Sequence, residues 1–211
     1  MSRNKLAEII ANLQESVSRG GMTRETVAAV IKELASIGYE YDYDAFPKLE
    51  NTEVFTDDSG DSPRTLAEAL LWKLGKWKSY KKFARQYSEE NSKPTDTDVV
   101  FFAFAKHLKN PESPIYDKHA IRAMWAICGN LTADEKAKCK KLLMNTKEEW
   151  KESGTGSSAV DCYKIYLKHL NEMVKAGATK QEIDLLLMPL GQAIKKSTSC
   201  FNEFRALCTL Y

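Results

Sequence analysis

The residues around position 117 could place a charged group at the start of a helix. Asp117 precedes an apolar pattern with helical spacing, so we expect its carboxylate at a helix N-terminus. The first backbone amides and the helix dipole keep a carboxylate ionised there, which suits it to interact with positive charge. The alternative is that Asp117 is an N-cap and nothing more, because an aspartate side chain accepts hydrogen bonds from the first amides of a helix.

A second group of residues combines positive charge with aromatic rings. The cations are Lys73, Lys76, Lys78, Lys81, Lys82 and Arg85, and the rings among them are Trp72, Trp77 and Tyr80. Such a surface can follow a nucleic-acid backbone while bases stack on the rings. The alternative is a solvated face of an amphipathic helix, because Leu74 and Phe83 require some of these rings to be buried.

The composition limits both the class of protein and the kind of site. Lysine and arginine total 31 against 29 acidic residues, so the net charge of +2 does not by itself attract the chain to nucleic acid or to an acidic membrane. The five cysteines show no CxxC spacing, and no two histidines flank a glutamate one helical turn apart. We therefore expect reduced thiols, no metal and no cofactor. No apolar run has membrane-spanning length and the N-terminus lacks a signal-peptide pattern, which favours a cytoplasmic protein without a membrane partner.

The spacing of apolar residues predicts an all-α fold in a single domain. The expected parts are an N-terminal helical hairpin at 1–38, a connecting loop at 39–61, and a core with C-terminal helices at 62–211. Three pairs match the capping-box spacing, in which two side chains satisfy free backbone amides at a helix start. They are Thr132 with Glu135, Thr146 with Glu149, and Thr179 with Glu182.

Within the core, the pattern predicts a helix that starts at Ser62 and Pro63 and breaks near Gly75. Its expected buried stripe contains Leu66, Ala69, Leu70, Leu74 and Trp77. Residues 99–108 are apolar on nearly every side, which predicts an enclosed central helix. Pro189 is expected to kink or end a later helix.

The order of elements from Ala69 to Ile127 resembles the core of the helix-hairpin-helix DNA glycosylases. The matching segment is Pro114-Ile115-Tyr116-Asp117-Lys118-His119-Ala120-Ile121-Arg122. It is similar to the segment of that superfamily in which an aspartate begins a helix. The resemblance implies a multi-helix orthogonal bundle, DNA as the partner, and hydrolysis of the N-glycosidic bond of a flipped modified base in DNA repair. Asp117 would then be the catalytic residue, because a fixed carboxylate stabilises the positive charge that develops on the sugar.

The same resemblance suggests roles for neighbouring side chains. His119 would contact the nucleotide or Asp117, Arg122 would face a phosphate or Asp117, and Lys118 would add positive charge. An ordinary position in the first helical turn, or an intrahelical ion pair, explains His119 and Arg122 equally well.

The chain departs from the superfamily pattern at two places. The position nineteen residues before Asp117, where a lysine nucleophile stands in strand-cleaving members, is Asp98. The resemblance therefore implies a monofunctional enzyme, a displaced lysine such as Lys93 or Lys106, or a degenerate, inactive site. The hairpin turn at 92–97 has no glycine for a phosphate to approach, so Lys93 and the threonines would have to replace it.

Two hypotheses of different class follow. The first is a DNA glycosylase-like protein that acts through Asp117. The second is a non-catalytic helical module that binds protein or nucleic acid through the surface from Lys73 to Arg85 and uses Asp117 as a helix cap.

Overall fold

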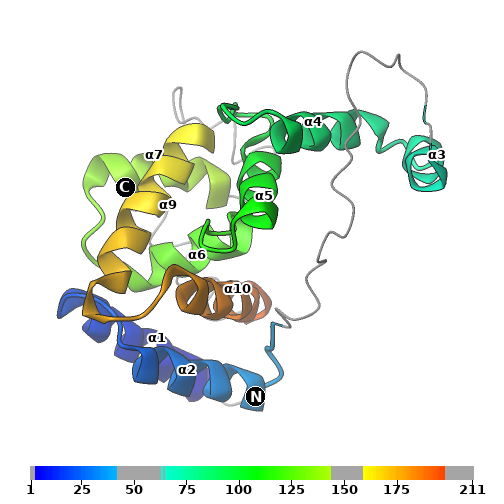
Figure 1. Cartoon of the computed structure of the whole chain (residues 1–211). Helices are drawn as coiled ribbons and strands as arrows, with labels where there is room; N and C mark the ends of the chain where they lie inside the picture. Colours follow the sequence, from blue (N-terminus) through cyan, green and yellow to red (C-terminus); the bar gives the residue numbers. More distant parts are fainter. Residues whose placement is uncertain (1–2, 42–62, 64, 144–158, 198–211) are drawn as a thin grey trace. The chain divides into compact units, whose positions relative to one another are not determined.

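The computed structural model describes residues 3–41, 63, 65–143 and 159–197. All regular structure in these ranges is helical, which confirms the predicted all-α class (Figure 1). The elements are α1 (Arg3–Ser18), α2 (Arg24–Ser36), α3 (Leu66–Lys73), α4 (Trp77–Ser88), α5 (Val99–Lys109), α6 (Lys118–Ile127), α7 (Ala133–Leu143), α9 (Ala159–Met173), the 3-10 helix η2 (Val174–Ala176) and α10 (Lys180–Lys196). Most of the predicted connecting loop, the Thr146 capping box, Cys200 and Cys208 lie outside the described residues.

The chain forms two compact units. The first unit combines Met1–Phe46 with Tyr116–Tyr211, and the second unit is Pro47–Ile115. This grouping differs from the single domain with a continuous 62–211 core that the sequence suggests. The sequence-based division followed chain order, whereas the contacts join segments that are distant in sequence.

In the first unit, α6 lies among four other helices. It packs against α1, α7, α9 and α10, and Figure 1 shows α10 between α6 and the α1–α2 hairpin. Fully buried apolar side chains of these two helices include Ile121, Met124 and Ile127 in α6 and Leu186, Leu187 and Leu190 in α10. The predicted N-terminal hairpin is present, since Leu6, Ile9 and Leu13 of α1 are buried and Thr23 caps α2. The enclosed helix of the first unit is therefore α6.

Close backbone packing joins α10 to the start of α6. A Cβ atom on Gly191 would lie 2.1 Å from the carbonyl oxygen of His119, a distance that no real side chain tolerates. Pro189 lies inside α10, which continues from Lys180 to Lys196 without the predicted end. The Thr179–Glu182 and Thr132–Glu135 capping boxes are both formed, as predicted.

The second unit is built from α3, α4 and α5. Helix α4 packs against both neighbours, with Phe83 against the rings of Phe101 and Phe104. Gly75 adopts a positive φ of 69° in the turn between α3 and α4, at the predicted helix break. Helix α5 was expected to be enclosed. Val99, Ala103, Ala105 and His107 are buried, but Val100 is exposed, so the enclosure is incomplete.

The start of α3 differs from the expectation as well. Thr65, rather than Ser62, is the N-cap, and Thr65 and Glu68 form a reciprocal capping box. The second carboxylate oxygen of Glu68 accepts a hydrogen bond from the Tyr80 hydroxyl at 2.9 Å. One buried carboxylate therefore caps α3 and joins it to α4.

Candidate functional site

Asp117 is the N-cap of α6, at the position the sequence predicted. Its Oδ1 atom accepts hydrogen bonds from the amides of His119 at 2.6 Å and Ala120 at 2.9 Å. Its Oδ2 atom accepts no hydrogen bond from the described residues, and the side chain is half-buried. Oδ1 thus caps the helix, while Oδ2 is available to a neighbouring group.

The residues expected to assist Asp117 have very different exposure. Lys118 is exposed and His119 is half-buried, but Arg122 is only 2% exposed. Its Nη1 atom lies 3.3 Å from Nδ1 of His119. Because a guanidinium can only donate, Nδ1 accepts this bond and the imidazole proton is on Nε2. Burial lowers the pKa of Arg122, and the nearby Asp117 carboxylate opposes that shift. The predicted contact of Arg122 with phosphate is therefore corrected: the side chain is enclosed by protein.

Three tyrosine rings pack together, and one of them is that of Tyr116, which precedes Asp117 in sequence. The ring of Tyr116 contacts those of Tyr163 and Tyr166, with centroids 5.0 and 5.4 Å apart. Tyr166 donates a hydrogen bond to the buried Asp184 at 2.8 Å. Burial raises the pKa of Tyr163 to about 12 and that of Tyr116 above its ordinary value. These phenols stay neutral and serve as packing groups.

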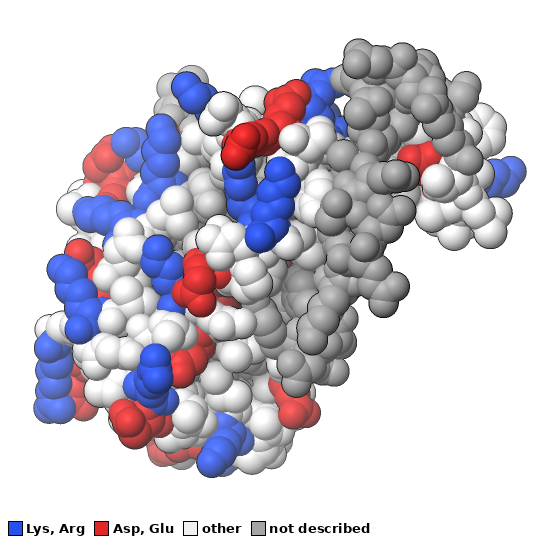
Figure 2. All heavy atoms as spheres, in the orientation of Figure 1, with Lys and Arg blue, Asp and Glu red and all other residues white. Residues whose placement is uncertain are grey.

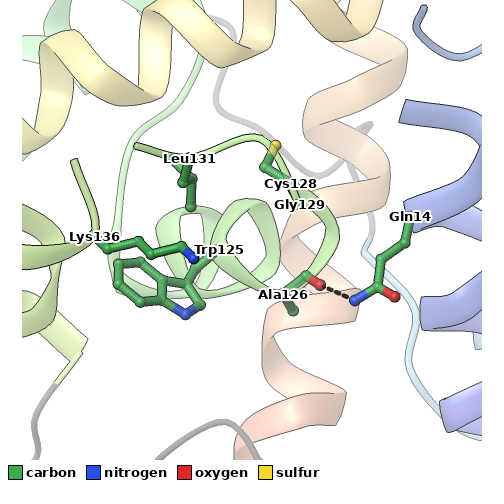
Figure 3. Close-up of a pocket in the computed structure, with 7 residues that line it drawn as sticks. All are labelled: Gln14, Trp125, Ala126, Cys128, Gly129, Leu131 and Lys136. Atoms are coloured by element: carbon green, nitrogen blue, oxygen red, sulfur yellow. Dashed lines mark hydrogen bonds between the residues drawn. The ribbon is translucent and has the colours of Figure 1, made fainter. Parts of the chain in front are cut away.

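A hollow of about 170 Å³ lies at the opposite end of α6 (Figure 3). It is lined by Gln14, Trp125, Ala126, Cys128, Gly129, Leu131 and Lys136. Gln14 spans one side, where its Nε2 donates to the carbonyl oxygen of Ala126 at 2.8 Å. The pocket contains neither Asp117 nor any other residue of the predicted site.

The first unit holds a buried charge cluster that the sequence did not indicate. Glu135 accepts hydrogen bonds from Lys168 at 2.6 Å and from the buried His169 at 3.0 Å. Burial would raise the pKa of Glu135, but the bonds from Lys168, the Thr132 amide and His169 outweigh it and lower the pKa to about 2. The partners are more than thirty positions apart in sequence, so no local pattern could have revealed the cluster.

The predicted cations of the second unit are concentrated on α4, on the turn before it and at the end of α3. We call Lys73, Lys76, Lys78, Lys81, Lys82 and Arg85 the α4 basic surface. All are exposed except Lys81, which is half-exposed. Helix α4 contains no acidic residue, and the nearest acids, Glu89 and Glu90, follow its last residue. Lys118, His119, Arg122 and Asp117 belong to the first unit, so the predicted site residues are divided between two units.

Lysines of the first unit have a different environment. Lys138 pairs with Asp134, Lys164 with Asp161, and Lys175 with Glu172, each three or four residues away on the same stretch of helix. Blue and red atoms accordingly lie side by side over this unit in Figure 2. The charges of these three lysines are therefore balanced within the first unit.

A carboxylate, that of Asp98, holds the turn between α4 and α5. Asp98 accepts hydrogen bonds from the amide of Thr95 at 2.6 Å and from Gln86 at 2.9 Å. Lys93 is exposed in this turn. Lys106 donates to the carbonyl oxygen of Glu90 at 2.9 Å. The Asp98 carboxylate thus stabilises the turn where the resemblance implied that a DNA phosphate would bind.

The sequence assigned the apolar residues of α3 to a buried stripe, and this was wrong. Leu66, Leu70 and Leu74 are 89%, 58% and 61% exposed, and Trp72 is 58% exposed. Trp77 is buried as expected, and its ring stacks on Tyr80 at 5.4 Å. Tyr80, bonded to Glu68, therefore joins α4 to α3, and Trp72 is the exposed ring beside the basic residues.

Comparisons with protein-family models, with curated proteins and with solved structures found no match. None of the described helices is both long and apolar enough to cross a membrane. Among the described residues, no group of three or more metal-ligating side chains could hold an ion. Cys128, Cys139 and Cys162 are free and buried, and burial raises the pKa of Cys128 to about 12.

Proposed function

We propose that this chain is a non-catalytic module that binds nucleic acid through the α4 basic surface. The observation that carries the proposal is the absence of acidic residues from α4, whose four cations occupy positions 78, 81, 82 and 85. Positions three and four residues apart share one face of a helix, so these cations form a continuous band. A band of four cations on one helix face, with no acid in the same helix, attracts a polyanion.

The contrast with the first unit supports this interpretation. There, lysines are matched by acids one turn away, so their fields largely cancel beyond the nearest contacts. With a net charge of +2, the whole chain gives no such attraction, and binding depends on local clustering. Asp117 needs no catalytic role in this module, because its bonds to two amides make it an N-cap.

The test is charge reversal on α4 with a matched reversal elsewhere. Fluorescence anisotropy would measure binding of a labelled oligonucleotide of about 20 nucleotides to the intact protein and to a Lys78→Glu, Lys81→Glu, Lys82→Glu triple variant. We expect the affinity to fall by at least about tenfold, and the salt dependence to become shallower by roughly two to three phosphate contacts.

The matched control is Lys32→Glu, Lys164→Glu, Lys175→Glu, which changes the net charge equally on the first unit. It should change the affinity by less than about threefold, because these exposed lysines lie outside the band. Equal losses in both triple variants would reject the α4 basic surface as the binding site and leave only a net-charge effect.

A second candidate is the glycosylase activity that the resemblance implies. The observation that favours it is the available Oδ2 atom of Asp117 at the N-terminus of α6. Oligonucleotides bearing different modified bases would be incubated with the protein and then heated in alkali, which cleaves at abasic sites. Asp117→Asn preserves the cap, since asparagine and aspartate cap equally well, but removes the charge. Base release that is lost in this variant supports the enzyme; no release by the intact chain, or equal release by both proteins, excludes it.

A further inference from the structure

We infer that the nucleic acid bound by the α4 basic surface is single-stranded, an inference that rests on the proposed function. It is carried by the apolar groups that lie among the cations. Trp72 is 58% exposed and immediately precedes Lys73, and Lys76 follows one turn later. An exposed indole beside cations is suited to stack on an unpaired base whose phosphate lies near the lysines.

The α3–α4 corner holds this arrangement in place. The Trp77 ring stacks on Tyr80, and the Tyr80 hydroxyl donates to Glu68, which also caps α3. The Tyr80–Glu68 hydrogen bond thus joins the start of α3, the helix that carries Trp72, to the first turn of α4. Little ordering is needed when a strand binds, because the ring and the cations are held on joined helices.

The neighbouring leucines point to the same ligand. Leu70 and Leu74 are more than half exposed on α3, on the helix that carries Trp72 and Lys73. The outer surface of a duplex consists of phosphates and sugars, with the base faces enclosed in the stack, so it offers little apolar area to such side chains. A single strand presents the faces of its bases, which can cover apolar groups as the phosphates meet the lysines.

One further feature disfavours a duplex. The turn between α4 and α5, which a duplex-binding hairpin would use, has its Thr95 amide occupied by Asp98 and contains a second acid, Asp96. The face of α4 opposite the cations is buried, with Trp77, Ala84 and Tyr87 in the interior, so the cations lie on the face that a ligand can reach. The cations from Lys78 to Arg85 extend over roughly 10 Å of helix, a length that one backbone can follow.

The experiment compares a labelled oligo(dT) strand of about 15 nucleotides with a labelled duplex of about 15 base pairs, using the intact protein and anisotropy at several salt concentrations. We expect the strand to bind at least about tenfold more tightly than the duplex. We also expect Trp72→Ala to weaken strand binding by roughly 5- to 100-fold, the range for losing one stacked base, with little effect on the duplex.

Two variants serve as controls. Trp72→Phe keeps an aromatic ring and should restore most of the strand affinity, whereas Leu66→Ala removes exposed apolar area far from Lys76 along α3 and should leave it unchanged. Tryptophan fluorescence provides a second readout, since stacking on Trp72 quenches its emission. The quench should disappear in Trp72→Phe although binding persists.

The outcomes of these binding measurements separate the single-strand inference from the proposed function. Equal or tighter binding of the duplex, or strand binding that survives Trp72→Ala, would overturn the inference and leave the proposed function standing. Failure of both oligonucleotides to bind would overturn the proposed function itself. Strand binding lost in Trp72→Ala and restored in Trp72→Phe would support both.

Discussion

Helices α3 and α6 are both short and rich in apolar residues, but they are covered in opposite ways. In α6 seven residues are buried, including Arg122, whereas in α3 the buried residue is Glu68 and the leucines face water. Helix α6 packs against four helices of its unit, while α3 packs against α4. The number of neighbouring helices therefore decides which residues leave water, and apolar spacing alone does not.

The two units also differ in how their charged side chains are paired. In the first unit carboxylates and lysines are paired, and the nearly buried Glu135 accepts hydrogen bonds from Lys168 and His169. In the second unit α4 has cations and no acids. The first unit thus pairs these lysines with acids of its own, whereas α4 carries cations with no acid in the same helix.

The largest expected effect comes from truncating an apolar side chain in each helix. Ile121→Ala in α6 should lower the free energy of unfolding by about 2 to 5 kcal/mol, because the residue is fully buried and leaves a cavity. Leu70→Ala in α3 should cost less than about 1 kcal/mol, because little area is lost from the interior. Urea unfolding followed by circular dichroism measures both. If both variants lowered the free energy of unfolding by similar amounts, α3 would be covered in solution, and α3 and α6 would not differ in burial.

The second effect concerns acid. The folded pKa of Glu135 is about 2, below its ordinary 4.5, so its stabilising contribution is complete above pH 4.5 and is lost as pH falls toward 2. The loss should approach about 3 kcal/mol. Thermal unfolding between neutral pH and the acid range should show a steep decline that Glu135→Gln removes. Glu172→Gln, in an exposed pair, should retain the decline.

The third effect tests the close approach of α10 to α6. Gly191→Ala should destabilise the first unit by about 1 to 3 kcal/mol, because the new Cβ atom meets the backbone of His119. Gly129→Ala is the matched control, since nothing lies within 4 Å of its Cβ position. A neutral Gly191→Ala, measured by the same urea titration, would mean that the two helices are farther apart.

The smallest effect concerns the cap of α6. Asp117→Ala should cost about 1 kcal/mol through two lost hydrogen bonds to amides, and Asp117→Asn should cost less because the amide oxygen still caps. Neither variant should alter nucleic-acid binding if the α4 basic surface alone holds the ligand. A binding defect in Asp117→Asn would instead connect the first unit to recognition.

Predictions made from local capping and helix-breaking residues were the most reliable ones. The caps at Thr132 and Thr179 and the break at Gly75 were all found where the residue types predicted them. Each depends on atoms a few residues apart, so the chain's local order is enough to specify it. Asp117 was located for the same reason.

Features that depend on distant segments were not predicted. The exposure of Leu70, the burial of Arg122 and the continuation of α10 through Pro189 all depend on which helix packs alongside. The α4 basic surface was visible because its cations are neighbours in sequence. The division of the predicted site residues between two units was not, because it arises from contacts between the N-terminal hairpin and helices after position 115.

The discontinuity of the first unit has a consequence for synthesis of the chain. Its N-terminal part ends at Phe46 and its remainder begins at Tyr116, with the whole second unit between them. At translation rates of roughly 5 to 20 residues per second, α1 and α2 wait several seconds for α6 and α10 to appear. Meanwhile the second unit can fold ahead of them. The apolar face of the early hairpin, with Leu6, Ile9 and Leu13, is thus an exposed intermediate surface on the ribosome.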